Sequence, residues 1–130
     1  MKVIPFDRAF PLIRVGARVH GPAGYADLKM VVDTGASITL ITPEMLTRLG
    51  YTDEHRIART TITTPLGKEP GHLLRVQAFR SLGHTFTDFA IHAHALADTA
   101  GIDGLLGLDF LGVFNFEIRL KQGVIRVELA

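Results

Sequence analysis

Several residue types that usually indicate a function are scarce or missing from this chain of 130 residues. It contains no cysteine, which excludes disulfides, thiolate nucleophiles and cysteine-ligated zinc. The formal net charge is only +1 and no two basic residues are adjacent, so we expect no nucleic-acid partner. No apolar run approaches the roughly 18 residues of a membrane span, and Pro5, Asp7 and Arg8 interrupt the start, unlike a signal peptide. We therefore expect no membrane segment and, by default, a cytoplasmic location.

The residues that are present predict a mostly β protein. Hydrophobic residues make up 47 % of the chain, and its length suits one domain spanning residues 1–130. Short runs rich in Val, Ile, Thr and Phe alternate with turn residues, as in β domains. The expected strands are 10–19, 25–32, 37–41, 56–64, 72–79, 85–94, 114–120 and 124–129, with a Gly/Pro-rich hairpin tip at 65–71 and Gly123 in a left-handed hairpin position.

Two short helical segments are also expected. Residues 42–50 have Thr42 to cap a helix, Pro43 at its first position and Gly50 as a left-handed stop. Residues 108–111 are expected to form a helical turn.

One acidic residue, Asp33, occupies a position that suits acid–base catalysis. Asp33 directly follows the apolar run of residues 25–32, and Gly35 permits a backbone path or close approach that a Cβ would block. A carboxylate at the mouth of a β core can be desolvated and held for acid–base catalysis. Taken alone, Asp-Thr-Gly favours the interpretation as an ordinary β-turn with Asp at its first position. A loose echo at 98–101 lacks the apolar run and the central glycine, and is interpreted as a loop.

A second motif decides between these interpretations. Residues 104–111 read Gly-Leu-Leu-Gly-Leu-Asp-Phe-Leu. Together with residues 31–36, Val-Val-Asp-Thr-Gly-Ala, they resemble the retropepsins, the retroviral-type single-domain aspartic peptidases. The resemblance implies a closed, β-barrel-like acid protease fold with one or two short helices and a flap hairpin around Gly67.

The resemblance also implies an activity. A pepsin-like chain is far longer and carries two catalytic motifs, whereas this chain carries one. It would therefore be an aspartic endopeptidase acting on polypeptides as a homodimer, with Asp33 from each subunit activating a water and with no cofactor or metal. The supporting loop residues would be Thr34, Gly35 and Ala36. The substrate contacts would be Gly35, Ser37, Leu66, Gly67 and Leu105.

This sequence departs from the family pattern at two positions. Ser37 stands where many retroviral enzymes have an acid that holds the substrate main chain, and Leu108 replaces a basic residue often paired with that acid. Asp109 is interpreted as a structural acid at a helix start.

Two alternatives remain. The chain could be a catalytically idle homodimer of the same fold that binds peptides or holds partners together. His92 and His94 lie two apart, so on a strand they share a face and could begin a metal site. We interpret them instead as surface strand histidines.

Overall fold

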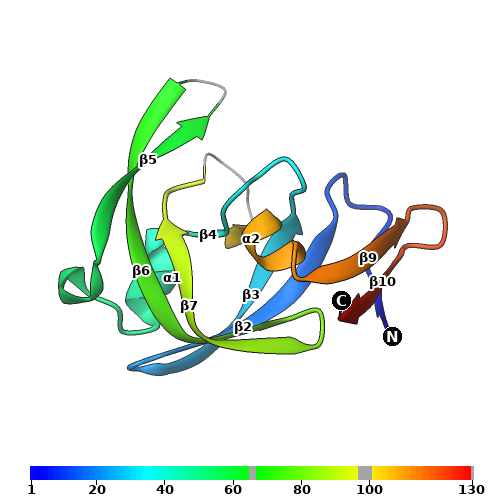
Figure 1. Ribbon diagram of the computed structural model, residues 1–130, viewed down its shortest axis with the longest axis horizontal. Helices are drawn as coiled ribbons and strands as arrows, with labels where there is room; N and C mark the ends of the chain where they lie inside the picture. The colour runs from blue at the N-terminus through cyan, green and yellow to red at the C-terminus, as the bar shows by residue number, and fades with distance from the viewer. Residues whose placement is uncertain (65–66, 97–100, 130) are drawn as a thin grey trace.

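The strands of the computed structural model form a closed barrel with a small sheet beside it (Figure 1). The structure describes residues 1–64, 67–96 and 101–129. The main sheet has the order β2-β3-β8-β4-β7-β6-β5, and pairing of β2 with β6 closes six strands into a barrel. The strands are β1 (Lys2–Pro5), β2 (Arg14–Gly21), β3 (Gly24–Val32), β4 (Leu40–Ile41), β5 (Ala58–Thr64), β6 (Gly67–Ser81), β7 (His84–Ala93), β8 (Gly104–Leu106), β9 (Phe114–Arg119) and β10 (Val124–Leu129), and the helices are α1 (Pro43–Arg48), α2 (Leu108–Leu111) and a 3₁₀ turn at Asp53–His55.

The barrel interior is apolar because its strands alternate. On β2, Val15, Ala17 and Val19 are buried while the residues between them are exposed. Phe79 and Phe110 are fully buried, and their ring centroids lie 5.3 Å apart. Burying each such side chain contributes about 1.5–3 kcal/mol, so the interior is the main source of stability.

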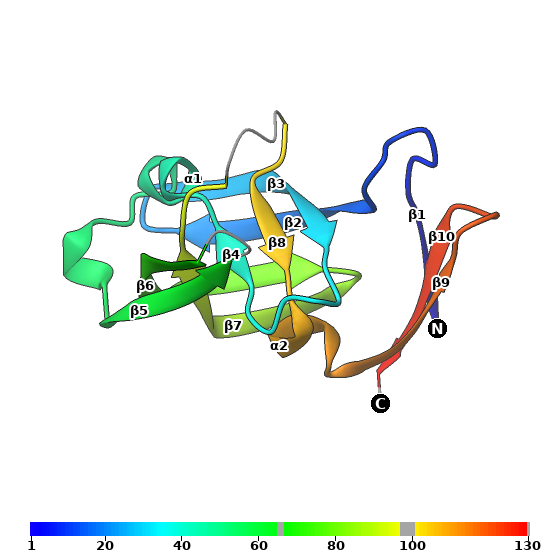
Figure 2. The same ribbon diagram turned by 90° about the horizontal axis from the view of Figure 1, so that it is seen from above.

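The chain ends form a separate three-stranded sheet with the order β1-β10-β9. Ile125 and Val127 of β10 are buried and belong to the main core, so this sheet packs one face against the barrel. It contains the first strand of the chain, β1, and the last, β10 (Figure 2). The strands at 114–120 and 124–129 are confirmed to within one residue, and Gly123 has the expected positive φ of 67°. β1 was not expected, because only its pairing with β10 makes it a strand.

The expected fold class is confirmed. The strand expected at 10–19 begins only at Arg14, and the one expected at 37–41 is limited to Leu40–Ile41. Two further local corrections concern the first helix and a hairpin. In the first helix Pro43 stands at the start and Gly50 has a φ of 92°, as expected, but Thr42 makes no side-chain capping bond. Its backbone is instead held by the barrel, since the Thr42 N–H donates to the Asp103 carbonyl at 3.0 Å.

No helix among the described residues is long and apolar enough to cross a membrane.

The second correction concerns the hairpin of β5 and β6. The loop expected at 65–71 is shorter, because β6 already begins at Gly67 and pairs there with Thr64. Pro70 is tolerated in this strand because β7 does not begin to pair with β6 until His72, and a missing N–H on an unpaired edge loses no ladder bond. The segment 98–100 of the motif echo, like the tip at 65–66, lies outside the described residues.

The end of this hairpin extends beyond the barrel. We call residues 60–64 and 67–71 the arm, since β5 and β6 pair there only with each other. The arm projects at the same end of the molecule as the loop of residues 33–39 (Figure 1).

Candidate active site

Asp33 lies in a loop that is held by a strand from the far end of the sequence. β3 ends at Val32, and β8 pairs with it in parallel on one side and with β4 on the other. The chain therefore leaves β3, loops over the end of β8 and returns as β4. The Asp33 N–H donates to the Leu106 carbonyl at 3.0 Å, which fixes the start of the loop against β8.

The loop orients the Asp33 carboxylate. The Gly35 N–H donates to Asp33 Oδ1 at 3.0 Å, and the Ala36 N–H donates to the Asp33 carbonyl at 3.2 Å. A Cβ added to Gly35 would lie 3.3 Å from Oδ1, tighter than side chains usually pack. Glycine at this position thus serves close approach to the carboxylate, and the half-buried Asp33 is held in one orientation by its own loop.

Thr39 and Asp109 lock the other end of the loop. Thr39 is fully buried, and its hydroxyl donates to Asp109 Oδ1 at 2.7 Å while accepting from the Gly107 N–H at 3.2 Å. The Thr39 N–H donates to Asp109 Oδ2 at 3.0 Å. Asp109 also accepts from the Phe110 N–H at 2.8 Å, so the acid joins α2 to the Asp33 loop. The interpretation of Asp109 as a structural acid fits this geometry, but Thr39 was missed because nothing local in an apolar run marks it.

Gly107 permits the close contact between α2 and the loop. A Cβ at this position would lie 2.4 Å from the Ile38 carbonyl oxygen and 3.0 Å from that of Ala36. Side chains do not occur at such distances, so only glycine lets the two backbones approach. The Leu108 N–H then donates to the Ala36 carbonyl at 2.8 Å. Residues 104–111, the second sequence motif, therefore pack directly against the Asp33 loop.

A row of side chains crosses the sheet next to Asp33. The strand registers pair Val31 with Leu105, Leu105 with Leu40, Leu40 with His92, and His92 with Leu73. Cross-strand partners share a face, and Asp33, two residues after Val31, continues on that face. The face that carries the carboxylate is thus mostly apolar; Val31 and Leu40 on it are buried, and Leu105 is half-buried.

His92 is the polar member of this row. Burial lowers the pKa of His92, an effect that the nearby Asp109 carboxylate opposes. Its Nδ1 is buried without a hydrogen-bond partner. The interpretation of His92 and His94 as surface histidines was wrong, because both are partly buried by neighbouring strands that the sequence does not place beside them.

The predicted site residues are partly brought together. Thr34, Gly35 and Ser37 are exposed on the Asp33 loop, and Ala36 is half-buried where it bonds to α2. Leu105 lies on the face just described, and Gly67 lies on the arm. Leu66 is outside the described residues.

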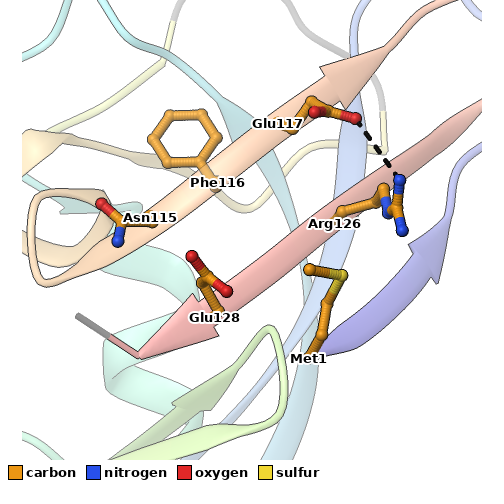
Figure 3. A pocket seen from close by; sticks show the side chains of 6 residues that line it. All are labelled: Met1, Asn115, Phe116, Glu117, Arg126 and Glu128. Atoms are coloured by element: carbon orange, nitrogen blue, oxygen red, sulfur yellow. Dashed lines mark ion pairs between the residues drawn. The ribbon is translucent and has the colours of Figure 1, made fainter.

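Two surface hollows lie elsewhere on the described part of the chain. One lies on the terminal sheet, where Glu117 of β9 and Arg126 of β10 form an ion pair of 3.9 Å (Figure 3). Its lining residues are Met1, Asn115, Phe116, Glu117, Arg126 and Glu128. A second hollow includes Arg18 of β2, Asp27 of β3 and Arg80 of β6 in its lining. Neither hollow includes a residue of the Asp33 loop.

Comparison with known proteins agrees with this geometry. The family model described as "Aspartyl protease" matches residues 15–110, which include both motifs. The chain belongs to the aspartyl protease family. Its structure is similar to the crystal structure of a retropepsin-like aspartic protease from Rickettsia conorii, with a TM-score of 0.71 and 24 % identity over 97 % of this chain and 88 % of that one. No curated protein matches the chain significantly. The fold is thus retropepsin-like.

Proposed function

We propose that this aspartyl protease family member is an aspartic endopeptidase whose active form is a homodimer with one Asp33 from each chain at the shared centre. The observation that carries the proposal is the Asp33 loop itself, with a carboxylate oriented by the Gly35 N–H at 3.0 Å and a backbone locked to β8 and α2. A loop fixed this firmly suits a catalytic group, because acid–base catalysis requires defined geometry.

The dimer follows from the number of carboxylates that the chemistry needs. One chain brings one Asp33, and a two-fold axis through the loop would place two side by side. Thr34 and Gly35 are exposed in the single chain, so they are available to the partner loop. Thr34 is proposed to hydrogen-bond across that axis.

The paired carboxylates would share one proton. At about 3 Å separation and an effective dielectric near 20, two negative charges repel by roughly 5 kcal/mol, so the pair resists losing its second proton, as in other aspartic proteases. The ionised member would take a proton from a bound water that attacks the peptide carbonyl. The protonated member would donate to the carbonyl oxygen. The titration belongs to the pair and not to one residue.

The substrate would lie between the Asp33 loop and the arm. Leu105 would present its half-buried apolar side chain on the carboxylate's face. Gly35 and Ser37 expose backbone and hydroxyl groups beside it, and the arm, with Gly67, would act as the flap. An extended peptide matches such a site because its backbone can bond to strands on either side.

A mixing experiment tests the proposal. Parent chains are combined in equal amounts with Asp33→Asn chains, and subunit exchange is verified with differently tagged chains. Random pairing leaves about a quarter of dimers with two Asp33 residues. Peptide cleavage should therefore fall to about a quarter of that of parent protein at the same total chain concentration. Activity that stays at half would show that each chain works alone.

The catalytically idle homodimer is the other reading that the experiment separates. Parent protein that binds peptides and dimerises, yet cleaves none of a diverse peptide library over the acidic to neutral range, would establish that reading instead. A chelator should leave cleavage unchanged, whereas a peptide carrying a hydroxyl in place of the scissile carbonyl should block it.

A further inference from the structure

The arm is tied to the barrel by one histidine. His94 follows the end of β7, and its N–H donates to the Ile41 carbonyl at 3.3 Å. Its Nε2 lies 2.7 Å from Glu69 Oε2, and its Nδ1 lies 3.2 Å from the Pro70 carbonyl oxygen. Glu69 and Pro70 both belong to the arm, where β6 has left β7. The His94 ring therefore joins two consecutive arm residues to the barrel.

The two partners of the ring are both satisfied in only one of its protonation states. A neutral imidazole has one N–H and one bare nitrogen, whereas an imidazolium has two N–H groups. A carboxylate oxygen and a backbone carbonyl oxygen are both acceptors, so only the imidazolium satisfies both contacts. When the imidazolium loses a proton, one nitrogen lone pair faces an oxygen lone pair, and one of the two hydrogen bonds is lost.

The surroundings of the ring leave Glu69 as its charged partner. The His94 side chain is 12 % exposed and that of Glu69 is 43 % exposed, so the pair is partly shielded from solvent. His92 lies two residues before on the same face, and burial lowers its pKa, which disfavours its charged form. β4 offers only the apolar Leu40 and Ile41.

Among the described residues, the other charged groups on neighbouring elements that we name next are directed elsewhere. His72 of β6 and Arg59 of β5 are cross-strand partners, and His72 pairs with Ala93. Ala93 precedes His94, so these side chains point to the opposite face. Asp103, before β8, accepts the Lys29 N–H at 2.8 Å.

We propose that Glu69 and His94 form a proton-dependent latch that holds the arm against the barrel. With His94 protonated, the ring binds both Glu69 and the Pro70 carbonyl and the arm is braced. With His94 neutral, the bracing is weakened and the arm opens more readily. Histidine changes charge between about pH 5 and 8, so the latch responds to pH within the range in which cells and their acidic compartments differ.

The latch gives the proposed peptidase a second, separate dependence on pH. This consequence rests on the proposed function, because it assumes that the arm covers the substrate. The Asp33 pair would set whether the chemistry can occur, whereas the latch would set how easily substrate enters and product leaves. The latch itself can be measured without any cleavage.

Hydrogen exchange of the arm amides tests the latch directly. Protection of residues 60–64 and 67–71 is measured at pH 5.5 and pH 8, after correction for intrinsic exchange rates. In the parent protein, protection should fall severalfold to roughly tenfold at the higher pH, the order expected for one partly exposed bond between charged groups. In the Glu69→Gln and His94→Gln variants, protection of the arm amides should be low and nearly equal at pH 5.5 and pH 8.

A matched control separates the latch from a general effect of substituting histidine. His72→Gln changes a residue on the same strand as Glu69 but on the opposite face. This variant should keep the parent's pH-dependent protection. Parent protection that is the same at both pH values, or unchanged by Glu69→Gln, would overturn the latch even if the protein cleaves peptides. Latch behaviour in a protein that fails the mixing experiment would overturn only the peptidase proposal.

Discussion

The Asp33 loop and the arm lie at the same end of the molecule but are held in different ways. The loop is fixed by buried contacts: Thr39 is 0 % exposed and bonds to Asp109 and Gly107 at 2.7 and 3.2 Å. The arm is held by strand pairing within the hairpin and by the partly exposed Glu69–His94 contact. Buried networks rigidify, whereas exposed ion pairs contribute little. The molecule thus combines a carboxylate that is fixed by buried contacts with an arm that is held by fewer contacts.

The largest expected effect is on catalysis. Asp33→Asn should lower peptide cleavage by at least about 10², because the pair loses its charged base. The amide is nearly isosteric, so the thermal unfolding midpoint should stay close to the parent's. Glu69→Gln, the same change made on the arm, should leave the maximal rate within a few-fold. Steady-state kinetics on both variants would check this, and equal losses would contradict the division between loop and arm.

The second largest effect is expected on stability, through the packing of α2 against the Asp33 loop. Gly107→Ala should destabilise the fold by about 1–3 kcal/mol or more, because its Cβ would meet the Ile38 carbonyl oxygen at 2.4 Å. Gly16→Ala is the control, since a Cβ there meets nothing within 4 Å, and its stability should be unchanged or slightly higher. Urea unfolding of the two variants measures the difference. Equal midpoints would show that α2 can shift away from the loop.

A smaller effect is expected from the hydroxyl that joins the loop to α2. Thr39→Val should cost roughly 1–2 kcal/mol, because the Gly107 N–H and Asp109 each lose a buried partner. Thr63→Val makes the same change at an exposed position of the arm and should stay within about 0.5 kcal/mol. Denaturant midpoints compare them, and a Thr39→Val variant as stable as the parent would refute the buried lock.

The smallest effect is the response of stability to pH. The folded-state pKa of His92 is lowered by burial, so the unfolded chain takes up a proton at higher pH than the folded one. The stability that neutral His92 contributes is therefore present above about pH 6.5, the ordinary histidine value, and is lost as the pH falls. His92→Gln should flatten this decline in unfolding experiments between pH 7 and pH 5. The Glu69–His94 latch has the opposite sign, since it is strengthened by acid.

Local features of the molecule could be predicted from the sequence because they depend on neighbouring residues. Pro43 and Gly50 delimit the first helix, and Gly123 takes its left-handed position, since φ preferences act within a few residues. The position of Asp33 at the end of a buried strand also follows from the apolar run before it. The role of Gly107 came from resemblance, because a glycine in an apolar run does not show by itself which backbone it must admit.

Other features were decided only by the tertiary structure. β8 lies between β3 and β4, two strands that come more than sixty residues earlier, and β2 closes the barrel on β6. Thr39 meets Asp109 seventy positions away, and Glu69 meets His94 twenty-five positions away. Such contacts depend on how the whole chain closes, since loop closure adds little energetic preference for any one long-range pair. The sequence by itself determined the acid and its turn, whereas the packing of distant strands determined what holds that acid still and what holds the arm above it.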